Sequence, residues 1–137
     1  MSSFAPFDDA RTLLLAANLV PASHIHWPNE PFREPAGDPP ALWLMVESIG
    51  TLLDPIEMGG GAWQESGTVF VHIMTPINAG SDAARALAKS IANVFRGLPA
   101  RNVVYRGASI GDGLHTDPAG MWWALTVSVD WVYQDIG

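Results

Sequence analysis

The clearest alternation of hydrophobic and polar positions lies near the C-terminus of the chain. From residue 121 to 133 every odd position is apolar or aromatic, including Trp123 and Trp131, whereas the even positions include Thr126 and Asp130. A period of two is typical of a β-strand that is buried on one face. We therefore predict a long strand over residues 121–133, with its odd positions in the core.

Three shorter segments also have the character of strands. Residues 41–50 alternate in the same way, residues 68–75 are rich in β-branched side chains, and residues 103–110 form a third segment. A glycine-rich stretch separates the first two segments, which favours a hairpin with a wide turn. Residues 111–120 are rich in Gly and Asp, and we expect them to form a polar loop.

Two segments have helical spacing. Between residues 81 and 96 the apolar positions recur every three or four residues. Ser81 is a suitable N-cap for this helix, and Gly97 follows its end. Residues 6–18 carry a similar stripe, which Pro21 ends. We therefore predict helices over residues 6–18 and 81–96.

Residues 21–40 contain six of the eleven prolines of the chain. This density forbids a helix and favours an extended arm similar to polyproline II. Within the arm, residues 25–27 have the sequence Ile-His-Trp and are compatible with a short edge strand before Pro28.

The predicted elements follow the order helix, arm, two strands, helix, two strands. This order predicts an α+β fold, in which a mostly antiparallel sheet of four to five strands packs against two helices. The length of 137 residues and the lack of internal repeats indicate a single domain over residues 1–137, with the proline-rich arm at about 21–40.

Composition and charge restrict the possible functions. Hydrophobic residues make up 48% of the chain and charged residues 15%, with a formal net charge of −7. This combination excludes a disordered chain. We also consider seven scattered cations too few for a surface that grips phosphates. The surplus of apolar residues suggests that part of the surface is buried against other subunits.

The chain contains no cysteine and no apolar stretch long enough to cross a bilayer. Acidic residues precede the apolar run near the N-terminus, unlike the basic start of a signal peptide. We therefore expect a soluble protein that is made and kept, or assembled, inside a cell, with no membrane partner.

Two groups of residues have the chemistry of a catalytic or metal site. Asp112, His115 and Asp117 fall in the predicted polar loop, where an acid and a histidine can act as a general base. His24 and His26 stand two positions apart, as two ligands of one metal do in an extended segment. Both groups lack the surrounding motifs that such sites require. We favour a turn and two exposed imidazoles, and we predict no catalytic, cofactor or metal site.

Three tryptophans are not explained by the predicted core. Trp27 lies in the arm, Trp63 near the glycine-rich turn, and Trp122 on the polar side of the last strand. Exposed tryptophan is typical of interface anchors. We therefore predict a subunit interface that includes these three residues, together with Pro28 and Asn29, which follow Trp27 in the arm.

Several of these segments together resemble a family of structural phage proteins. The arm "HIHWPNEPFREP", the strand "LWLMVESI" and the segment "GTVFVHIMTPINAGSDAARALAKSIANVFRG" are similar to the small tail-terminator proteins of long-tailed phages, prophages or gene transfer agents. The resemblance in pattern covers nearly the whole chain. Its most specific part is the strand that leads through Pro and Gly into an Ala-rich helix ending in Phe-x-Gly.

The resemblance implies a structural role. Tail terminators form a ring, typically of six subunits, that caps the tail tube, stops its polymerisation and provides the surface for head joining. The implied partners are other copies of the chain, the tail-tube protein and the head–tail connector. The implied location is the head-proximal end of the virion tail, after assembly in the bacterial host cytoplasm. An acidic channel lining would let DNA pass without specific binding, and the family implies no catalytic residue or cofactor.

Two alternatives remain open at this stage. The first is another neck, connector or tail-tube component of the same particle. The second is a small enzyme or metal-binding domain that uses Asp112, His115 and Asp117, or the pair His24 and His26.

Overall fold

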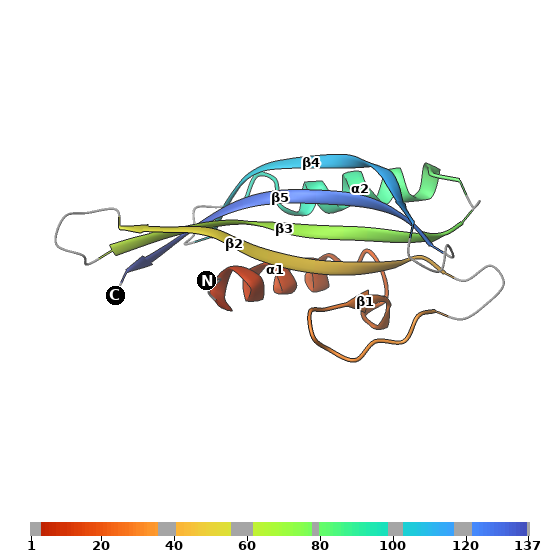
Figure 1. The fold of residues 1–137 in the computed structure, drawn as a ribbon, viewed down its shortest axis with the longest axis horizontal. Helices are drawn as coiled ribbons and strands as arrows, with labels where there is room; N and C mark the ends of the chain where they lie inside the picture. Colours follow the sequence, from red (N-terminus) through yellow and green to blue (C-terminus); the bar gives the residue numbers. More distant parts are fainter. Residues whose placement is uncertain are drawn as a thin grey trace.

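Among the described residues, the two α-helices lie on one face of a five-stranded sheet (Figure 1). The computed structural model describes residues 4–35, 41–55, 62–77, 80–98, 103–116 and 122–136. Its elements, in chain order, are α1 (Phe4–Ala17), the 3-10 helix η1 (Ala22–His24), β1 (Ile25–His26), β2 (Trp43–Pro55), β3 (Ala62–Pro76), α2 (Asp82–Val94), β4 (Val103–Thr116) and β5 (Trp122–Ile136).

The sheet has the strand order β1-β2-β3-β5-β4. The three pairings between the long strands, β2 with β3, β3 with β5 and β5 with β4, are antiparallel. The two-residue β1 runs parallel to β2. The central pair, β3 and β5, is in register from Ala62 opposite Ile136 to Pro76 opposite Trp122. The prediction of an α+β fold with a mostly antiparallel sheet on two helices is confirmed.

The strands extend beyond their predicted ends. The β2–β3 hairpin continues to Pro55 and resumes at Ala62, and β4 continues through Thr116. The prediction of a loop over residues 111–120 is therefore wrong for 111–116. The backbone ladder with β5 resumes after an irregularity, with His115 opposite Ala124. Ladder hydrogen bonds join backbone groups, so polar side chains on an edge strand do not prevent them.

The core lies between the helices and the helix-facing side of the sheet, which we call the covered face. Alternate residues of β3 and β5 supply the sheet side of the core, and small and branched residues of the helices supply the other side. Its fully buried members include Val69, Val71, Ile73, Ala84, Ala88, Ile91, Leu125, Val127 and Trp131. The predicted burial of the odd positions of β5 is confirmed from Leu125 to Trp131, whereas Trp123 and Tyr133 are half-buried against the core and residue 121 lies outside the described residues.

Helix α2 begins and ends close to the predicted bounds. Gly97 has φ +67°, a left-handed conformation that follows the end of many helices and favours glycine. Ser81 precedes the helix, but its hydroxyl makes no capping bond to the backbone. The Ser81 Oγ instead accepts a hydrogen bond from Arg85 Nε at 3.0 Å.

The described part of the arm is held against the domain. The predicted edge strand is confirmed, because Ile25 lies opposite Leu44 in a parallel pairing that continues for one more residue. The following turn includes Asn29, whose φ of +55° is a left-handed conformation that asparagine tolerates. Burial of the apolar side chains of this segment holds it on the domain, so it is not a free arm. Residues 36–40 lie outside the described residues.

Candidate functional site

Trp27 is buried in its own subunit. Its indole is 6% exposed and lies edge-on against Phe7 of α1, with ring centres 6.1 Å apart. The Arg11 guanidinium lies 4.8 Å from the centre of the indole ring, and Arg11 also forms an ion pair with Glu30. The expectation that Trp27 is exposed is therefore wrong, because the segment after β1 folds back onto α1. The interface role of Trp27 remains a prediction.

Trp122 is also buried, on the side of the sheet opposite the helices, which we call the open face. It is 2% exposed and packs edge-on against Trp43, with ring centres 5.7 Å apart. Its indole Nε1 donates a hydrogen bond to Glu34 at 3.0 Å. The expectation that Trp122 is exposed is wrong, because the sequence does not reveal what covers the even positions of β5 at this end.

The chain after β1 passes around the β2 edge and reaches the open face. Phe32 stacks on His26 at 4.9 Å and contacts Trp43 at 4.8 Å between ring centres. Phe32 and Met45 thus pack against a second apolar cluster, formed by the buried residues Trp43, Met74, Trp122 and Ala124. One segment therefore places Trp27 against α1 on one side of the sheet and reaches Trp122 through Glu34 on the other.

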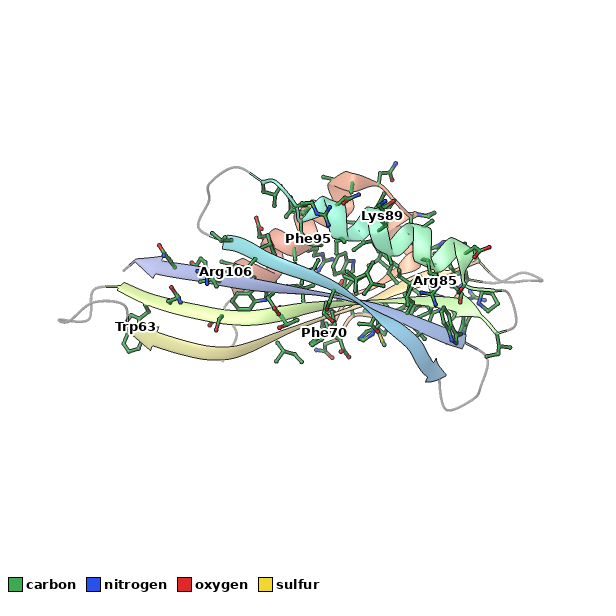
Figure 2. The ribbon with its side chains drawn as sticks, turned by 90° about the horizontal axis from the view of Figure 1, so that it is seen from above. Trp63, Phe70, Arg85, Lys89, Phe95 and Arg106 are labelled. Atoms are coloured by element: carbon green, nitrogen blue, oxygen red, sulfur yellow. The ribbon has the colours of Figure 1, made fainter. Side chains whose placement is uncertain are left out.

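Trp63 is the one exposed residue among the three tryptophans of the predicted interface. It stands near the start of β3, where β2, β3 and β5 extend together (Figure 2). Its exposed fraction is 39%, and its register partners are Pro55 and Asp135. Pro28 and Asn29 are exposed in the turn after β1. These three residues keep the exposure that the interface prediction requires.

The centre of the open face is a polar surface around His72. His72 Nδ1 lies 2.8 Å from Thr126 Oγ1, and His72 Nε2 lies 3.2 Å from Glu47 Oε2. The imidazole also stacks with Phe70, at 6.3 Å between ring centres. Both ring nitrogens of His72 therefore have hydrogen-bond partners within the subunit.

The candidate residues for chemistry fall on separate elements in the part of the chain that the structure describes. His24 lies in η1 and His26 in β1, where His26 stacks on Phe32. Asp112 and His115 lie along β4 instead of in a turn, and Asp117 falls outside the described residues. Among the described residues, no three His, Asp or Glu side chains are close enough to hold a metal ion together.

The described residues line surface grooves, two of which are formed by the segment around β1 and by α2 with β4. The larger, of about 740 Å³, lies along the segment after β1, and its lining includes the paired residues Arg11 and Glu30. The smaller, of about 380 Å³, lies between the end of α2 and the start of β4. Phe95 and Tyr105 line it, with ring centres 4.8 Å apart, together with Arg96 and Arg106.

The positive charges are not scattered. Residues 81–108 hold five of the seven cations and one of the fourteen acidic residues, a net charge of +4. Arg85 and Lys89 lie along the outer side of α2, and Arg106 lies on the neighbouring β4 (Figure 2). Residues 21–61, which include β1 and β2, hold six acidic residues and one cation, a net charge of −5.

Among the described residues, positions 81–108 keep four cations and one acidic residue, and positions 21–55 keep four acidic residues and one cation, so these two parts of the chain carry opposite net charge. The net charge of the whole chain hides this asymmetry, and for that reason the sequence-based prediction missed it. Counting charge segment by segment finds it from the sequence alone.

Within the described residues, no helix has the length and apolar character needed to span a bilayer. A comparison with curated proteins gave no match. One solved structure has the same fold, with a TM-score of 0.65 and 20% sequence identity over 100% of this chain and 99% of the other.

A family model described as "Phage tail terminator protein" matches residues 9–131. This match runs from α1 to β5 and includes both edges of the sheet. The family is structural, and its members are components of the phage tail. The chain belongs to the phage tail terminator family.

Proposed function

We propose that this protein forms a ring, typically of six copies, that caps the phage tail tube and stops its polymerisation. The head-proximal side of the ring then provides the surface for the head–tail connector. The observation that carries this proposal is the family match over residues 9–131. Assembly takes place in the bacterial host cytoplasm, and the finished ring stays at the head-proximal end of the tail.

The arrangement of the subunit supports a ring. Both helices cover one face of the sheet, while β4 at one edge and most of β2 near the other have a free side among the described residues. A ring uses heterologous contacts, in which one surface of a subunit meets a different surface of the next. Two unlike edges on one sheet provide such a pair of surfaces.

The charge of the chain supports a passive role toward DNA. The formal net charge of −7 repels phosphate groups over distances of about 10 Å at moderate salt. DNA that moves through the ring is therefore not retained by specific binding. The proposed role of the protein is structural, because the protein binds the end of the tube and excludes further tube subunits.

A tube-assembly experiment tests this function. Purified tail-tube protein is polymerised with and without this protein, and tube lengths are measured by negative-stain electron microscopy. We expect shorter tubes that carry a ring at one end. Tubes of unchanged length would contradict termination. If the protein binds finished tubes or connectors but does not limit tube length, it is another neck component, and if it polymerises alone it is a tube subunit.

A further inference from the structure

We propose that the groove between the end of α2 and the start of β4 binds an extended acidic segment of a partner protein. We call this site the α2–β4 groove; positions within 92–97 and 105–108 line it, together with Val129. The segment adds to the free edge of β4, and its carboxylates contact the two arginines of the groove. This inference goes beyond the capping role, because it concerns a surface of the single subunit and depends on neither a ring nor a tube.

Two guanidinium groups belong to the lining of the α2–β4 groove. Arg96 follows the last turn of α2, Arg106 lies near the start of β4 (Figure 2), and both are exposed. No ion pair between described residues involves either of them. A guanidinium presents parallel N–H groups that match the two oxygens of a carboxylate. The groove is therefore complementary to acidic side chains.

The carboxylates associated with the lining already have partners within the subunit. Asp9 accepts a hydrogen bond from the hydroxyl of Tyr105 at 2.7 Å. Asp130 lies opposite Gly107 in the register, but its side chain is on the open face, where Thr68 Oγ1 donates to it at 2.9 Å. These interactions leave the charges of the two arginines to a ligand.

The floor of the groove is apolar and aromatic. Phe95 is 4% exposed, and the centre of its ring lies 4.8 Å from that of Tyr105. Ala92 of α2 and Val129 of β5 are buried beside them. The volume of about 380 Å³ is in the range of sites that hold small apolar groups. An apolar floor between two cations fits an apolar side chain that is flanked by acidic ones.

Strand β4 offers its backbone next to the groove. It is the last strand of the sheet order and pairs with β5, with no strand on its other side among the described residues. The register shifts between Tyr105 and Gly107, so Arg106 is the extra residue of a bulge, a device that redirects a side chain. After the bulge, Gly107 and Ala108 are exposed, and a Cβ atom at Gly107 would meet no atom within 4 Å. A partner strand can therefore approach β4 here.

The spacing within such a partner strand follows from its geometry. Alternate side chains of a strand point to the same face of a sheet. On β4, Ala108 and Ile110 share the covered face, since their register partners are Val129 and Val127, and Ile110 is 44% exposed. A strand added beyond β4 presents every second residue to the same side. The groove therefore selects acidic and apolar residues that stand two positions apart.

A peptide is favoured over nucleic acid because cations, apolar floor and free strand edge occur together. A phosphate backbone would use the guanidinium groups alone, whereas an extended peptide uses all three features. The net charge of −7 also repels a long polyanion. Charges beyond about 10 Å are screened at moderate salt, so a short acidic segment is affected chiefly by the residues around the groove.

A labelled model peptide tests the site on the full-length protein. The probe is Thr-Glu-Thr-Val-Thr-Glu-Thr-amide with an N-terminal fluorophore, and fluorescence anisotropy measures its binding. In the control peptide, Lys replaces both Glu residues. We expect saturable binding of the acidic peptide and binding of the control that is weaker by about tenfold or more. No binding of the acidic peptide up to about 1 mM would overturn the proposal.

Charge reversal on α2 provides a matched pair of variants. Arg96→Glu and Lys89→Glu both reverse an exposed cation, but only Arg96 lines the groove. We expect Arg96→Glu to weaken peptide binding by about tenfold, as loss of a charge-assisted hydrogen bond does, and Lys89→Glu to leave it nearly unchanged. Equal weakening by both variants would indicate general charge attraction and overturn the site. Circular dichroism verifies folding, and Arg106→Gln repeats the test from β4 if Arg96→Glu does not fold.

N-methylated peptides test the addition of a strand without changing the protein. Methylation of every second peptide nitrogen removes the backbone donors along one edge of the peptide and keeps its charge. Two such probes are compared, one methylated at the odd residues and one at the even residues. We expect one of them to lose binding and the other to retain it. Equal binding of both probes and the parent peptide would overturn strand addition.

The remaining outcomes separate this proposal from others. Binding of a short DNA duplex that Arg96→Glu abolishes, without binding of the acidic peptide, would assign the groove to nucleic acid and overturn the proposal. Tubes of unchanged length would remove the capping function and leave the peptide site standing, because the peptide experiment contains no tube. Shortened tubes without peptide binding would retain the function and remove this site.

Discussion

The indole of Trp131 lies directly over Gly67, its register partner on β3. A Cβ atom at Gly67 would overlap both this indole and the carbonyl oxygen of Ile49. Trp131 is 1% exposed, so the ring has little room to move away. The buried position of the Trp131 indole thus requires a residue without a side chain at position 67 of the neighbouring strand β3.

Replacement of Gly67 by Ala is expected to destabilise the protein by about 3 kcal/mol, as overpacking against backbone and a rigid ring does. Chemical denaturation monitored by tryptophan fluorescence measures the change. Gly107→Ala is the matched control, because an added Cβ there meets no atom within 4 Å. We expect the control to change stability by less than about 0.5 kcal/mol. Equal effects would mean that the close approach of Trp131 is not required.

Truncation of Trp131 to Ala is expected to cost about 3–5 kcal/mol, through lost burial and the cavity left in the core. Thermal and denaturant unfolding of the monomer measure this loss. A cost below about 1 kcal/mol would contradict its central place between β3, β5 and the helices.

Trp27→Ala is expected to lower the melting temperature of the monomer, with a cost of about 3 kcal/mol. Trp27 is buried against Phe7 within its own subunit, so its truncation removes packing from the monomer itself. Trp63→Ala is the comparison, because Trp63 is 39% exposed. We expect it to leave the monomer nearly unchanged and to weaken assembly or tube binding. If Trp63→Ala destabilised the monomer and Trp27→Ala left its stability unchanged, the packing of Trp27 on α1 would be contradicted.

Removal of the Tyr105 hydroxyl tests the link between α1 and β4. This hydroxyl donates a hydrogen bond to Asp9 Oδ2 at 2.7 Å, and hydrogen bonds to charged groups contribute about 1.5–3 kcal/mol. Tyr105→Phe is therefore expected to destabilise the protein by about 1.5 kcal/mol, whereas Tyr133→Phe serves as a tyrosine control on β5. Urea unfolding compares the two variants. No difference between them would show that the bond contributes nothing to stability.

Salt is expected to weaken binding of the acidic peptide if its carboxylates pair with Arg96 and Arg106 in the α2–β4 groove. Between 0.1 and 1 M salt the screening length falls from about 10 Å to about 3 Å. Fluorescence anisotropy across this range measures the change. An association that strengthens steadily with salt would indicate an apolar contact and would argue against charge pairing.

The periodicity of apolar residues predicts most of the helices and strands, because it depends on which side of each element is buried. The stripe of α2 and the odd positions of β5 need no knowledge of the rest of the chain. When the side chains of a strand face solvent, the spacing of its apolar residues does not show where the strand ends. For this reason the sequence-based prediction assigns the second half of β4 to a loop. Backbone pairing with β5 decides that boundary.

The burial of Trp27 and Trp122 depends on contacts that spacing does not record. The alternation of residues along β5 correctly places Trp122 on the open face. The residues that bury its indole include Glu34 and Trp43, which are distant from it in the sequence. Trp27 has no regular pattern around it, and only contact with α1 shows that it is core. By contrast, the opposite net charges of residues 81–108 and 21–61 follow from the amino-acid sequence, because each is a continuous segment of the chain.

The two unlike edges of the sheet have a consequence for growth. In an open row of head-to-tail copies, one edge of each kind stays exposed at the ends, so each end accepts another subunit, as in a fibre. In a closed ring of such copies every contact surface is occupied, and addition stops without a separate signal. The angle between neighbouring subunits then sets the number of copies. Under the proposed function, the protein that ends the elongation of the tail tube therefore also ends its own assembly.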